Sequence, residues 1–304
     1  MIIKTPPYLK PGDTIGIVCP SGYMAFEKAA ECVRVLQEEW GYKVKVGSTL
    51  GSKSATYFSG TDEERLNDFQ QMLDDDAVQA VLCGRGGYGM GRIIDKISFK
   101  KFKKNPKWVI GFSDITIFHC YLYANYYISS LHAPMAAAFN DGGYLNQYVQ
   151  SLKDALEGKW ARYSSEGHEL DRHGEAIGEL VGGNLSLLVN TIGTDAEIKT
   201  KGRILFIEDI GEQKYAIDRM IFQLKRSGKL DKLAGMIVGG LSEIKDTDRP
   251  FGEDIHQIIY NAVKEYKYPV CFDFPVSHEK ENYALKIGVG YKLKVGTKKV
   301  TLEE

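Results

Sequence analysis

The sequence predicts an α/β protein with two domains, a doubly wound parallel sheet followed by a smaller domain that mixes β and α structure. Three observations predict this fold. Short apolar runs alternate with helix-period segments in the first half, a turn-rich polar stretch follows, and the tail alternates apolar and polar residues. We therefore expect domains at residues 1–142 and 176–304, joined by a linker at 143–175.

The apolar runs of the first half have the length of buried strands and lie at residues 14–19, 42–46, 78–83, 108–110 and 127–131. Helix-period segments lie between them, at residues 25–40, 63–73, 90–97 and 115–126. A capping box, Thr61 to Glu64, begins the second of these helices. Parallel sheets bind ligands at the carboxyl ends of their strands, and the loops that begin at Gly84 and Gly111 follow two such ends.

The second half continues the alternation and then changes its pattern. We expect strands at residues 176–181, 203–208 and 235–238. One helix follows each strand: the first begins at Asn184, the second covers residues 216–226 and the third covers residues 254–266. The tail, YALKIGVGYKLKVGTKKVTLEE, alternates apolar and polar side chains around a Gly-Thr turn. This pattern is typical of a half-exposed antiparallel hairpin, so the second domain is mixed rather than purely doubly wound.

Composition argues against several classes of function. A formal net charge of -1 over 304 residues provides no field to attract nucleic acid or an anionic membrane. No apolar stretch is long enough to span a bilayer, and the N-terminus lacks a signal-like apolar region, so we expect a cytoplasmic protein. The five cysteines form no CxxC pair, and no Cys/His cluster has metal-ligand spacing. We therefore expect buried, reduced thiols and neither a metal nor a cofactor.

The stretch VIGFSDITIF, residues 109–118, places a serine on a tight turn from strand to helix. This is the geometry of a nucleophile elbow, in which the turn exposes the Ser113 hydroxyl and the N–H of Asp114 points to a developing oxyanion. The motif GxSDxT differs from the GxSxG of α/β-hydrolases. A simple N-cap role for Ser113 or Asp114 explains the same local pattern, so both interpretations stay open here.

The stretch CGRGGYGMG, residues 83–91, is a second candidate. Gly84, Gly86 and Gly89 match GxGxxG, which suggests a dinucleotide site, but the carboxylate expected about 20 residues further on is missing. Glycines also let the backbone approach a ligand closely, so Gly87 or a neighbour is a candidate for a second oxyanion donor. A plain structural turn is the third interpretation.

A serine nucleophile needs a base, and the base needs an orienting group. His132 and His278 follow apolar runs at loop positions, whereas His119 lies nearly two helical turns past Ser113 and should point away from the helix start. The remaining histidines lie in the polar linker or on a charged helix: His168, His173 and His256. The strand RILFIED ends in Glu208 and Asp209, and a carboxylate there is a candidate orienting group or the N-cap of the next helix.

Five motifs occur in an order that resembles a known family. They are GRGGYG at 84–89, GFSDIT at 111–116, GGNLSLL at 182–188, FIEDIGEQKYAIDRM at 206–220 and SHEKENYALKIG at 277–288. The chain looks like an LD-carboxypeptidase of the serine-peptidase group that also includes the microcin C immunity peptidases. The resemblance covers essentially the whole chain.

The resemblance implies a Ser-Glu-His triad, with Ser113 as nucleophile, Glu208 as carboxylate and His278 as base. It also implies a first domain like that of class I glutamine amidotransferases, a smaller swivelling second domain, and an active site at the domain interface. The implied assembly is a homodimer. The N–H groups of Asp114 and Gly87 are our candidates for the oxyanion donors.

The activity implied by the resemblance is hydrolysis of the L–D amide bond of a murein tetrapeptide, with release of the terminal D-alanine in cytoplasmic cell-wall recycling. A carboxypeptidase also needs a cation for the free carboxylate of its small peptide substrate, and Arg85 beside the glycine loop is our candidate. We expect no partner beyond this peptide and a second copy of the chain, and neither nucleic acid nor a membrane.

Three positions depart from the family pattern. Ser277 stands where glycine usually precedes the histidine, Lys286 stands where proline is frequent, and His132 lies in a segment that usually reads HGPM. We interpret His132 as structural. Two alternatives stay open: an amidase of the microcin C immunity type that acts on aminoacyl-nucleotide mimics, and a non-hydrolytic nucleotide-binding protein that uses the Gly84–Gly89 loop.

Overall fold

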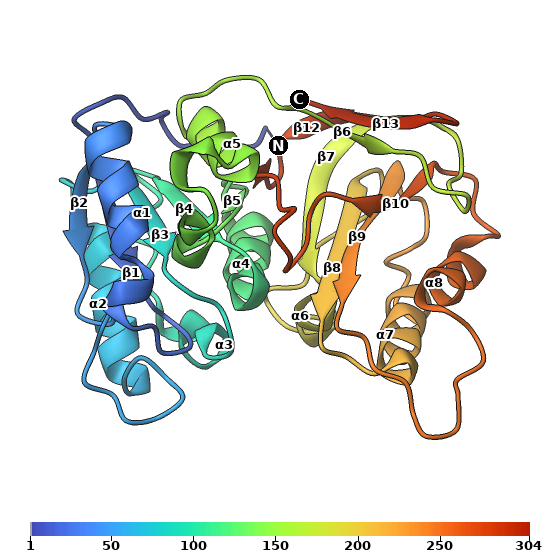
Figure 1. Cartoon of the computed structure of the whole chain (residues 1–304), viewed down its shortest axis with the longest axis horizontal. Coiled ribbons are helices and arrows are strands. Elements are labelled where there is room, and N and C mark those ends of the chain that lie inside the picture. Colours follow the sequence, from blue (N-terminus) through green and yellow to red (C-terminus); the bar gives the residue numbers. More distant parts are fainter. Residues whose placement is uncertain (1) are drawn as a thin grey trace. The chain divides into compact units, whose positions relative to one another are not determined.

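The computed structural model describes residues 2–304, which fall into two compact units (Figure 1). Unit 1 comprises the chain up to Lys159 together with Tyr283–Lys286, and unit 2 comprises Trp160–Asn282 and Ile287–Glu304. Each unit has one β-sheet and several helices, which is the mixed α/β architecture that the sequence predicts. Within the described residues, every helix is too short or too polar to cross a membrane.

Unit 1 is built on a six-stranded sheet with the order β11-β5-β4-β3-β1-β2. Its strands are β1 (Thr14–Val18), β2 (Lys43–Val46), β3 (Ala80–Cys83), β4 (Trp108–Gly111), β5 (Leu131–His132) and β11 (Leu285–Lys286). The strands β1 to β5 pair in parallel, and β11 pairs antiparallel with β5. Because the strand order reverses at β1, right-handed crossovers place the helix after β1 on one face and the helices after β2, β3 and β4 on the other.

Helices cover both faces of this sheet (Figure 1). The helices of unit 1 are α1 (Ala30–Arg34), α2 (Asp62–Asp74), α3 (Met90–Ile93), α4 (Thr116–Tyr126) and α5 (Gln147–Leu156). The core on one face combines α1 and α5 side chains such as Cys32 and Leu152 with strand residues such as Ile17. Across the other face, the rings of Phe69 in α2 and Phe118 in α4 lie 5.3 Å apart. Unit 1 is therefore wound on both faces, as expected.

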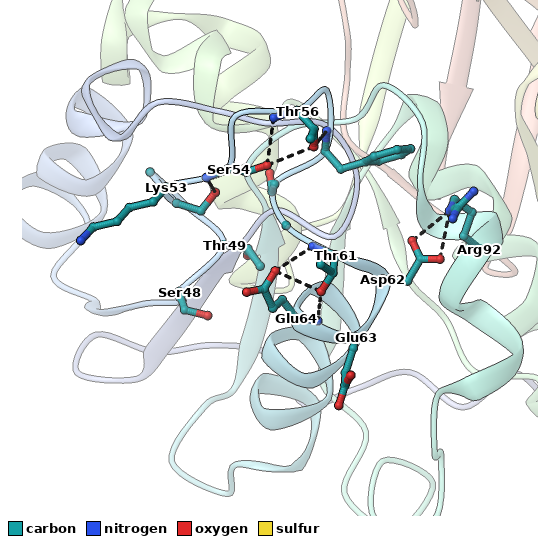
Figure 2. Close-up of a pocket in the computed structure, with 15 residues that line it drawn as sticks. Ser48, Thr49, Lys53, Ser54, Thr56, Thr61, Asp62, Glu63, Glu64 and Arg92 are labelled. Atoms are coloured by element: carbon teal, nitrogen blue, oxygen red, sulfur yellow. Dashed lines mark hydrogen bonds and ion pairs between the residues drawn. The ribbon is translucent and has the colours of Figure 1, made fainter.

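The predicted capping box of α2 is confirmed. The Thr61 hydroxyl accepts a hydrogen bond from the Glu64 N–H, and the Glu64 carboxylate accepts one from the Thr61 N–H (Figure 2). Next to this box, Asp62 forms an ion pair with Arg92, with 2.9 Å between Oδ1 and Nε. Asp62 also pairs with the fully buried Arg65, whose guanidinium donates to the Gly89 carbonyl at 3.1 Å. The start of α2 thereby fixes the glycine loop that precedes α3.

Unit 2 is built on a seven-stranded sheet with the order β10-β9-β8-β7-β12-β13-β6. Its strands are β6 (Arg162–Glu166), β7 (Gly174–Asn184), β8 (Ile204–Ile210), β9 (Gly235–Ser242), β10 (Val270–Phe274), β12 (Gly290–Val295) and β13 (Lys299–Glu303). The strands β7 to β10 are parallel and are joined by α6 (Leu185–Asn190), α7 (Lys214–Arg226) and α8 (Ile255–Val263). The strands β12, β13 and β6 are antiparallel, so the sheet is mixed.

The tail follows the sequence prediction only in part. The strands β12 and β13 form the expected antiparallel hairpin, in which exposed and buried residues alternate along β12. The first part of the tail behaves differently, because Leu285 pairs with His132 and Lys286 pairs with Leu131 of the unit 1 sheet. The Lys286 side chain is buried and its Nζ lies 5.1 Å from the centre of the Tyr8 ring. A strand of two residues carries no periodicity, which is why the sequence pattern missed it.

Candidate active site

Ser113 lies on the turn that joins β4 to α4. Phe112 is extended with a φ of -147°, whereas Ser113 has a φ of 60°, in the left-handed region that costs a non-glycine residue energy. A short 3-10 turn, Ser113–Ile115, then leads into α4. Since α4 begins after Ile115, the interpretation of Ser113 or Asp114 as its N-cap is wrong. The strained strand-to-helix turn instead matches the geometry of a nucleophile elbow.

Asp114 connects this turn to the glycine loop. Its side chain is fully buried, and Oδ2 accepts hydrogen bonds from the Ser21 hydroxyl at 2.5 Å and from the N–H of Met90 at 2.7 Å. Burial raises the pKa of the Asp114 carboxyl above its usual value, although the bonds from Ser21 and Met90 oppose the shift. Because Met90 is the first residue of α3, one carboxylate fixes both the turn and the end of the loop.

The glycine loop packs directly against Ser113. A Cβ atom added to Gly86 would lie 2.8 Å from the Ser113 Cβ, 3.0 Å from its Oγ and 3.5 Å from the Asp114 nitrogen. Gly84 lies equally close to Cys19, and Gly89 to Arg65, so these glycines accommodate the protein's own groups. Gly87 follows with a φ of 96°, and its Cβ would lie 2.6 Å from the Tyr57 hydroxyl. This packing indicates that the glycine loop supports the turn that carries Ser113, and it argues against an open dinucleotide-binding loop.

Replacing Gly86 by alanine is expected to reduce kcat/KM by about 100-fold. The new methyl group would overlap the Ser113 side chain and displace its hydroxyl from the position needed for attack. Gly86 does not have a positive φ, so the backbone itself accepts alanine. The control is Gly290→Ala, since an added Cβ there meets nothing within 4 Å. Hydrolysis of the peptide that the sequence resemblance implies as substrate, and thermal unfolding, should be measured for both variants. Full activity of Gly86→Ala would contradict the inference that the close packing of Gly86 against Ser113 positions the serine.

His119 supports the same turn from inside the protein. Its Nε2 lies 2.8 Å from the Gly111 carbonyl and its Nδ1 lies 2.8 Å from the Ser130 hydroxyl. A carbonyl only accepts, so Nε2 carries the proton and Nδ1 accepts from Ser130. Burial lowers the pKa of His119 to about 4, which keeps the ring neutral. His132 is likewise fully buried, on β5 beside Gly111. Both histidines lie in the scaffold beneath the turn.

Unit 2 holds the second part of the predicted site. Glu208 is fully buried on β8, and its Oε2 lies 2.5 Å from Nδ1 of His278. Ile207 pairs with Val238 and Asp209 pairs with Leu241, so the extra residue lies in β9 and Glu208 keeps the regular alternation of β8. Successive side chains of a strand point to opposite faces of the sheet. Glu208 and Asp209 therefore meet different partners.

Asp209 binds the scaffold rather than the histidine. Its Oδ1 accepts from the Asn184 amide at 2.9 Å, and its Oδ2 accepts from the Ser186 N–H at 2.9 Å. Burial, together with the negative charge of Glu208, raises the pKa of Asp209 to about 6, although the hydrogen bonds oppose the shift. Asn184 also caps α6 by accepting from the Leu187 N–H. The motif GGNLS thus holds the start of α6 against β8, a role that its position in the sequence did not reveal.

The loop that carries His278 follows β10, and Ser277 organises it. The Ser277 hydroxyl donates to the Glu281 carbonyl at 2.9 Å and accepts from the Glu279 N–H at 3.0 Å. A Cβ added to Gly240 would lie 2.5 Å from the Ser277 Cβ, so Gly240 makes room for the serine. Serine in place of the usual glycine therefore has a partner for its hydroxyl and space for its side chain.

The remaining predicted residue, Arg85, is exposed on the loop after β3. One of its terminal nitrogens donates to the Tyr23 carbonyl at 2.8 Å. Unit 1 thus brings together Ser113, Asp114 and the Arg85–Gly87 segment, and unit 2 brings together Glu208 and His278. An open groove of about 1010 Å³ lies beside α2 and is lined by polar residues such as Ser54 and Arg92 (Figure 2). The described residues that line this groove include none of the predicted site residues.

Comparison with known proteins decides the family. The family model of the LD-carboxypeptidase N-terminal domain matches residues 15–133, and the family model of the LD-carboxypeptidase C-terminal domain matches residues 177–293. A probable murein peptide carboxypeptidase of Bacillus subtilis (strain 168) is 36% identical over 303 residues, which are 98% of this chain and 94% of that protein. The chain belongs to the LD-carboxypeptidase family.

Solved structures agree with this assignment. The crystal structure of muramoyltetrapeptide carboxypeptidase from Oxalobacter formigenes matches this LD-carboxypeptidase with a TM-score of 0.86 and 28% identity, over 95% of this chain and 98% of that chain. In sequence, the chain also matches the microcin C7 self-immunity protein MccF of Escherichia coli, with 25% identity over 100% of this chain and 98% of that protein. The resemblance inferred from the five motifs is confirmed, and the protein is a serine-type LD-carboxypeptidase.

Proposed function

We propose that this LD-carboxypeptidase hydrolyses the L–D amide bond of murein tetrapeptide and releases the terminal D-alanine, as a step of cytoplasmic cell-wall recycling. The names of its relatives, a probable murein peptide carboxypeptidase and a muramoyltetrapeptide carboxypeptidase, support this substrate class. The observation that carries the proposal is the buried Glu208 carboxylate bonded to His278, on a chain that also holds Ser113 on a strained turn.

In the proposed mechanism, Ser113, Glu208 and His278 act as one triad. The Glu208 carboxylate accepts a hydrogen bond from the Nδ1–H of His278, which leaves Nε2 unprotonated as the base. Nε2 takes the proton of the Ser113 hydroxyl while Oγ attacks the carbonyl carbon of the third peptide residue. The imidazolium then protonates the amine of D-alanine, the C–N bond breaks, and an acyl-enzyme remains. Water, activated by the same imidazole, attacks this ester and regenerates the hydroxyl.

The environment of His278 suits a base of this kind. Burial alone would lower its pKa, but the hydrogen bond to Glu208 and the charges of Glu208 and Asp209 outweigh burial, so the pKa is raised. A base with a raised pKa binds the serine proton more firmly in the transition state. The same shift protonates the imidazole in mildly acidic solution, so we expect activity to fall as the pH decreases through this pKa.

The charge that develops on the carbonyl oxygen needs donors on unit 1. We assign this role to the N–H groups of Asp114 and Gly87, each of which would stabilise the transition state by about 3 kcal/mol. Gly86 lies against Ser113 and its neighbour Gly87 shares the same turn, which supports the assignment. Arg85, on the same loop, is assigned to the free carboxylate of the terminal D-alanine.

The test is mass spectrometry of purified protein incubated with L-Ala-D-Glu-meso-diaminopimelate-D-Ala, beside the same peptide ending in L-alanine. We expect D-alanine release from the first peptide and no cleavage of the second. Absence of release from folded protein would overturn the murein substrate. The same assay should include the lysine-containing peptide and an aminoacyl sulfamoyl nucleotide, because cleavage of the nucleotide alone would assign an activity of the type expected from MccF.

A further inference from the structure

Three potential metal ligands converge in unit 2, outside the residues assigned to the triad. They are His168 in the loop after β6, His256 in the first turn of α8 and Asp273 on β10. One ligand atom from each lies within 4.8 Å of the other two. Nε2 of His256 lies 2.8 Å from Oδ1 of Asp273, and Nε2 of His168 lies 3.9 Å from Oδ2. We propose that these three side chains form a binding site for a zinc ion.

The backbone of β10 is distorted where it presents Asp273. The register between β10 and β9 shifts between Cys271 and Phe274, and Asp273 has a φ of 53°. Aspartate in the left-handed region costs energy that a regular strand would avoid. The bulge turns Asp273 outward from a strand whose other residues are buried. This strain places a carboxylate between two imidazoles.

The two imidazoles are held by packing and by backbone bonds. The buried Phe272 ring lies 5.5 Å from the His168 ring and 5.8 Å from the His256 ring, and the two imidazoles are 4.9 Å apart. Asp171 accepts from the N–H of His168 and from the N–H of Phe272, each at 2.9 Å. The loop after β6 is thereby fixed to β10, so the ligand side chains are oriented before any ion binds.

Two imidazole nitrogens and one carboxylate oxygen are a donor set that suits zinc and leaves a fourth position for water. Tetrahedral zinc with bonds of about 2.0–2.2 Å places its ligand atoms roughly 3.4 Å apart. The separation from His256 Nε2 to Oδ1 of Asp273 is 2.8 Å and that from His168 Nε2 to Oδ2 is 3.9 Å, so small side-chain rotations would bring one carboxylate oxygen to this spacing from both nitrogens. The side chains of His168, His256 and Asp273 keep 23%, 27% and 55% of their surface exposed, so an ion can reach them from solvent.

Zinc binding requires one local rearrangement. In the metal-free protein, Nδ1 of His168 accepts from the Leu170 N–H at 3.1 Å, which places the ring proton on Nε2. Coordination through Nε2 moves this proton to Nδ1 and breaks the bond to Leu170. The ion then links the loop after β6, the start of α8 and β10, so it should stabilise unit 2 rather than take part in catalysis.

The test uses the tag-free, full-length protein after treatment with a chelator. Calorimetric titration with ZnCl2 is expected to show one ion per chain, thermal unfolding should shift to higher temperature with added zinc, and Co2+ should give the visible absorption of a tetrahedral site. His256→Ala and Asp273→Asn should weaken binding at least about tenfold and remove the thermal shift. Circular dichroism without metal establishes that both variants are folded.

Two matched variants separate this site from other zinc binding. His173→Ala removes an exposed histidine of the same segment, and His278→Ala removes the proposed catalytic base; both should retain wild-type zinc affinity. Loss of binding in His278→Ala with retention in His256→Ala would place the ion at the triad and overturn the proposal. Absence of binding to the wild type, or equal binding by the wild type and Asp273→Asn, would also overturn it.

Discussion

Replacing Ser113 by alanine is expected to lower kcat on murein tetrapeptide by about a million-fold, because the proposed mechanism then has no nucleophile. Alanine also occupies the left-handed conformation only with strain, so the substitution does not relax the turn. KM should change little, since the hydroxyl contributes to bond making rather than to binding. The measurement is D-alanine release over long incubation, beside Ser98→Ala, which alters an exposed serine of the same unit.

The double variant Ser113→Ala/His278→Ala sharpens this prediction. Residues that act as a unit are strongly non-additive, so the double variant should be about as slow as Ser113→Ala alone. Additive losses would show that the two residues work independently and would contradict the triad. Residual activity in Ser113→Ala near the wild-type level would require another nucleophile. The five cysteines are poor replacements because all are buried, and burial raises the pKa of Cys19 to about 12.

Replacing Glu208 by glutamine is expected to lower kcat by about 10,000-fold and to shift the acid limb of kcat/KM to lower pH. The carboxylate raises the pKa of His278, so its removal lowers that pKa, and the imidazole stays neutral in more acidic solution. The rate falls nevertheless, because an amide that donates to Nδ1 forces the proton onto Nε2 and removes the base. The measurement is kcat/KM across the acid and neutral range for both proteins.

Asp209→Asn is the matched variant for this experiment. The Asp209 charge also raises the pKa of His278, but its oxygens bond Asn184 and the N–H of Ser186 rather than the imidazole. The acid limb should therefore shift in the same direction with a much smaller loss of kcat. If Glu208→Gln and Asp209→Asn had equal effects on kcat, control of the tautomer by Glu208 would be excluded.

The regular parts of the fold were predictable because they rest on local patterns. The strands of unit 1 alternate with helices where apolar runs alternate with helix-period segments, and Thr61 and Glu64 form the capping box that their spacing predicts. The hairpin of β12 and β13 follows from strict alternation around its turn. Each of these features depends on residues close together in the chain.

The details that position chemistry depend on contacts that sequence spacing does not encode. Glu208 and Asp209 are neighbours on β8, and only the packing of the loop after β10 against that strand determines that Glu208, rather than Asp209, bonds His278. Gly86 was visible only as part of a loose GxGxxG pattern, although it is the glycine that lies against Ser113. The residues of the proposed zinc site, His168, His256 and Asp273, come from three separate segments, so ligand spacing along the chain does not reveal them.

The return of Tyr283–Lys286 to the sheet of unit 1 has a consequence for dissecting the protein. A fragment that ends at Lys159 would lack β11, and β5 would become an edge strand with unpaired backbone groups. Such an edge invites pairing with another chain, so the isolated first half should be prone to aggregation. Unit 1 is therefore complete only when the chain has been made as far as Lys286, so its sheet cannot close before most of unit 2 has been synthesised.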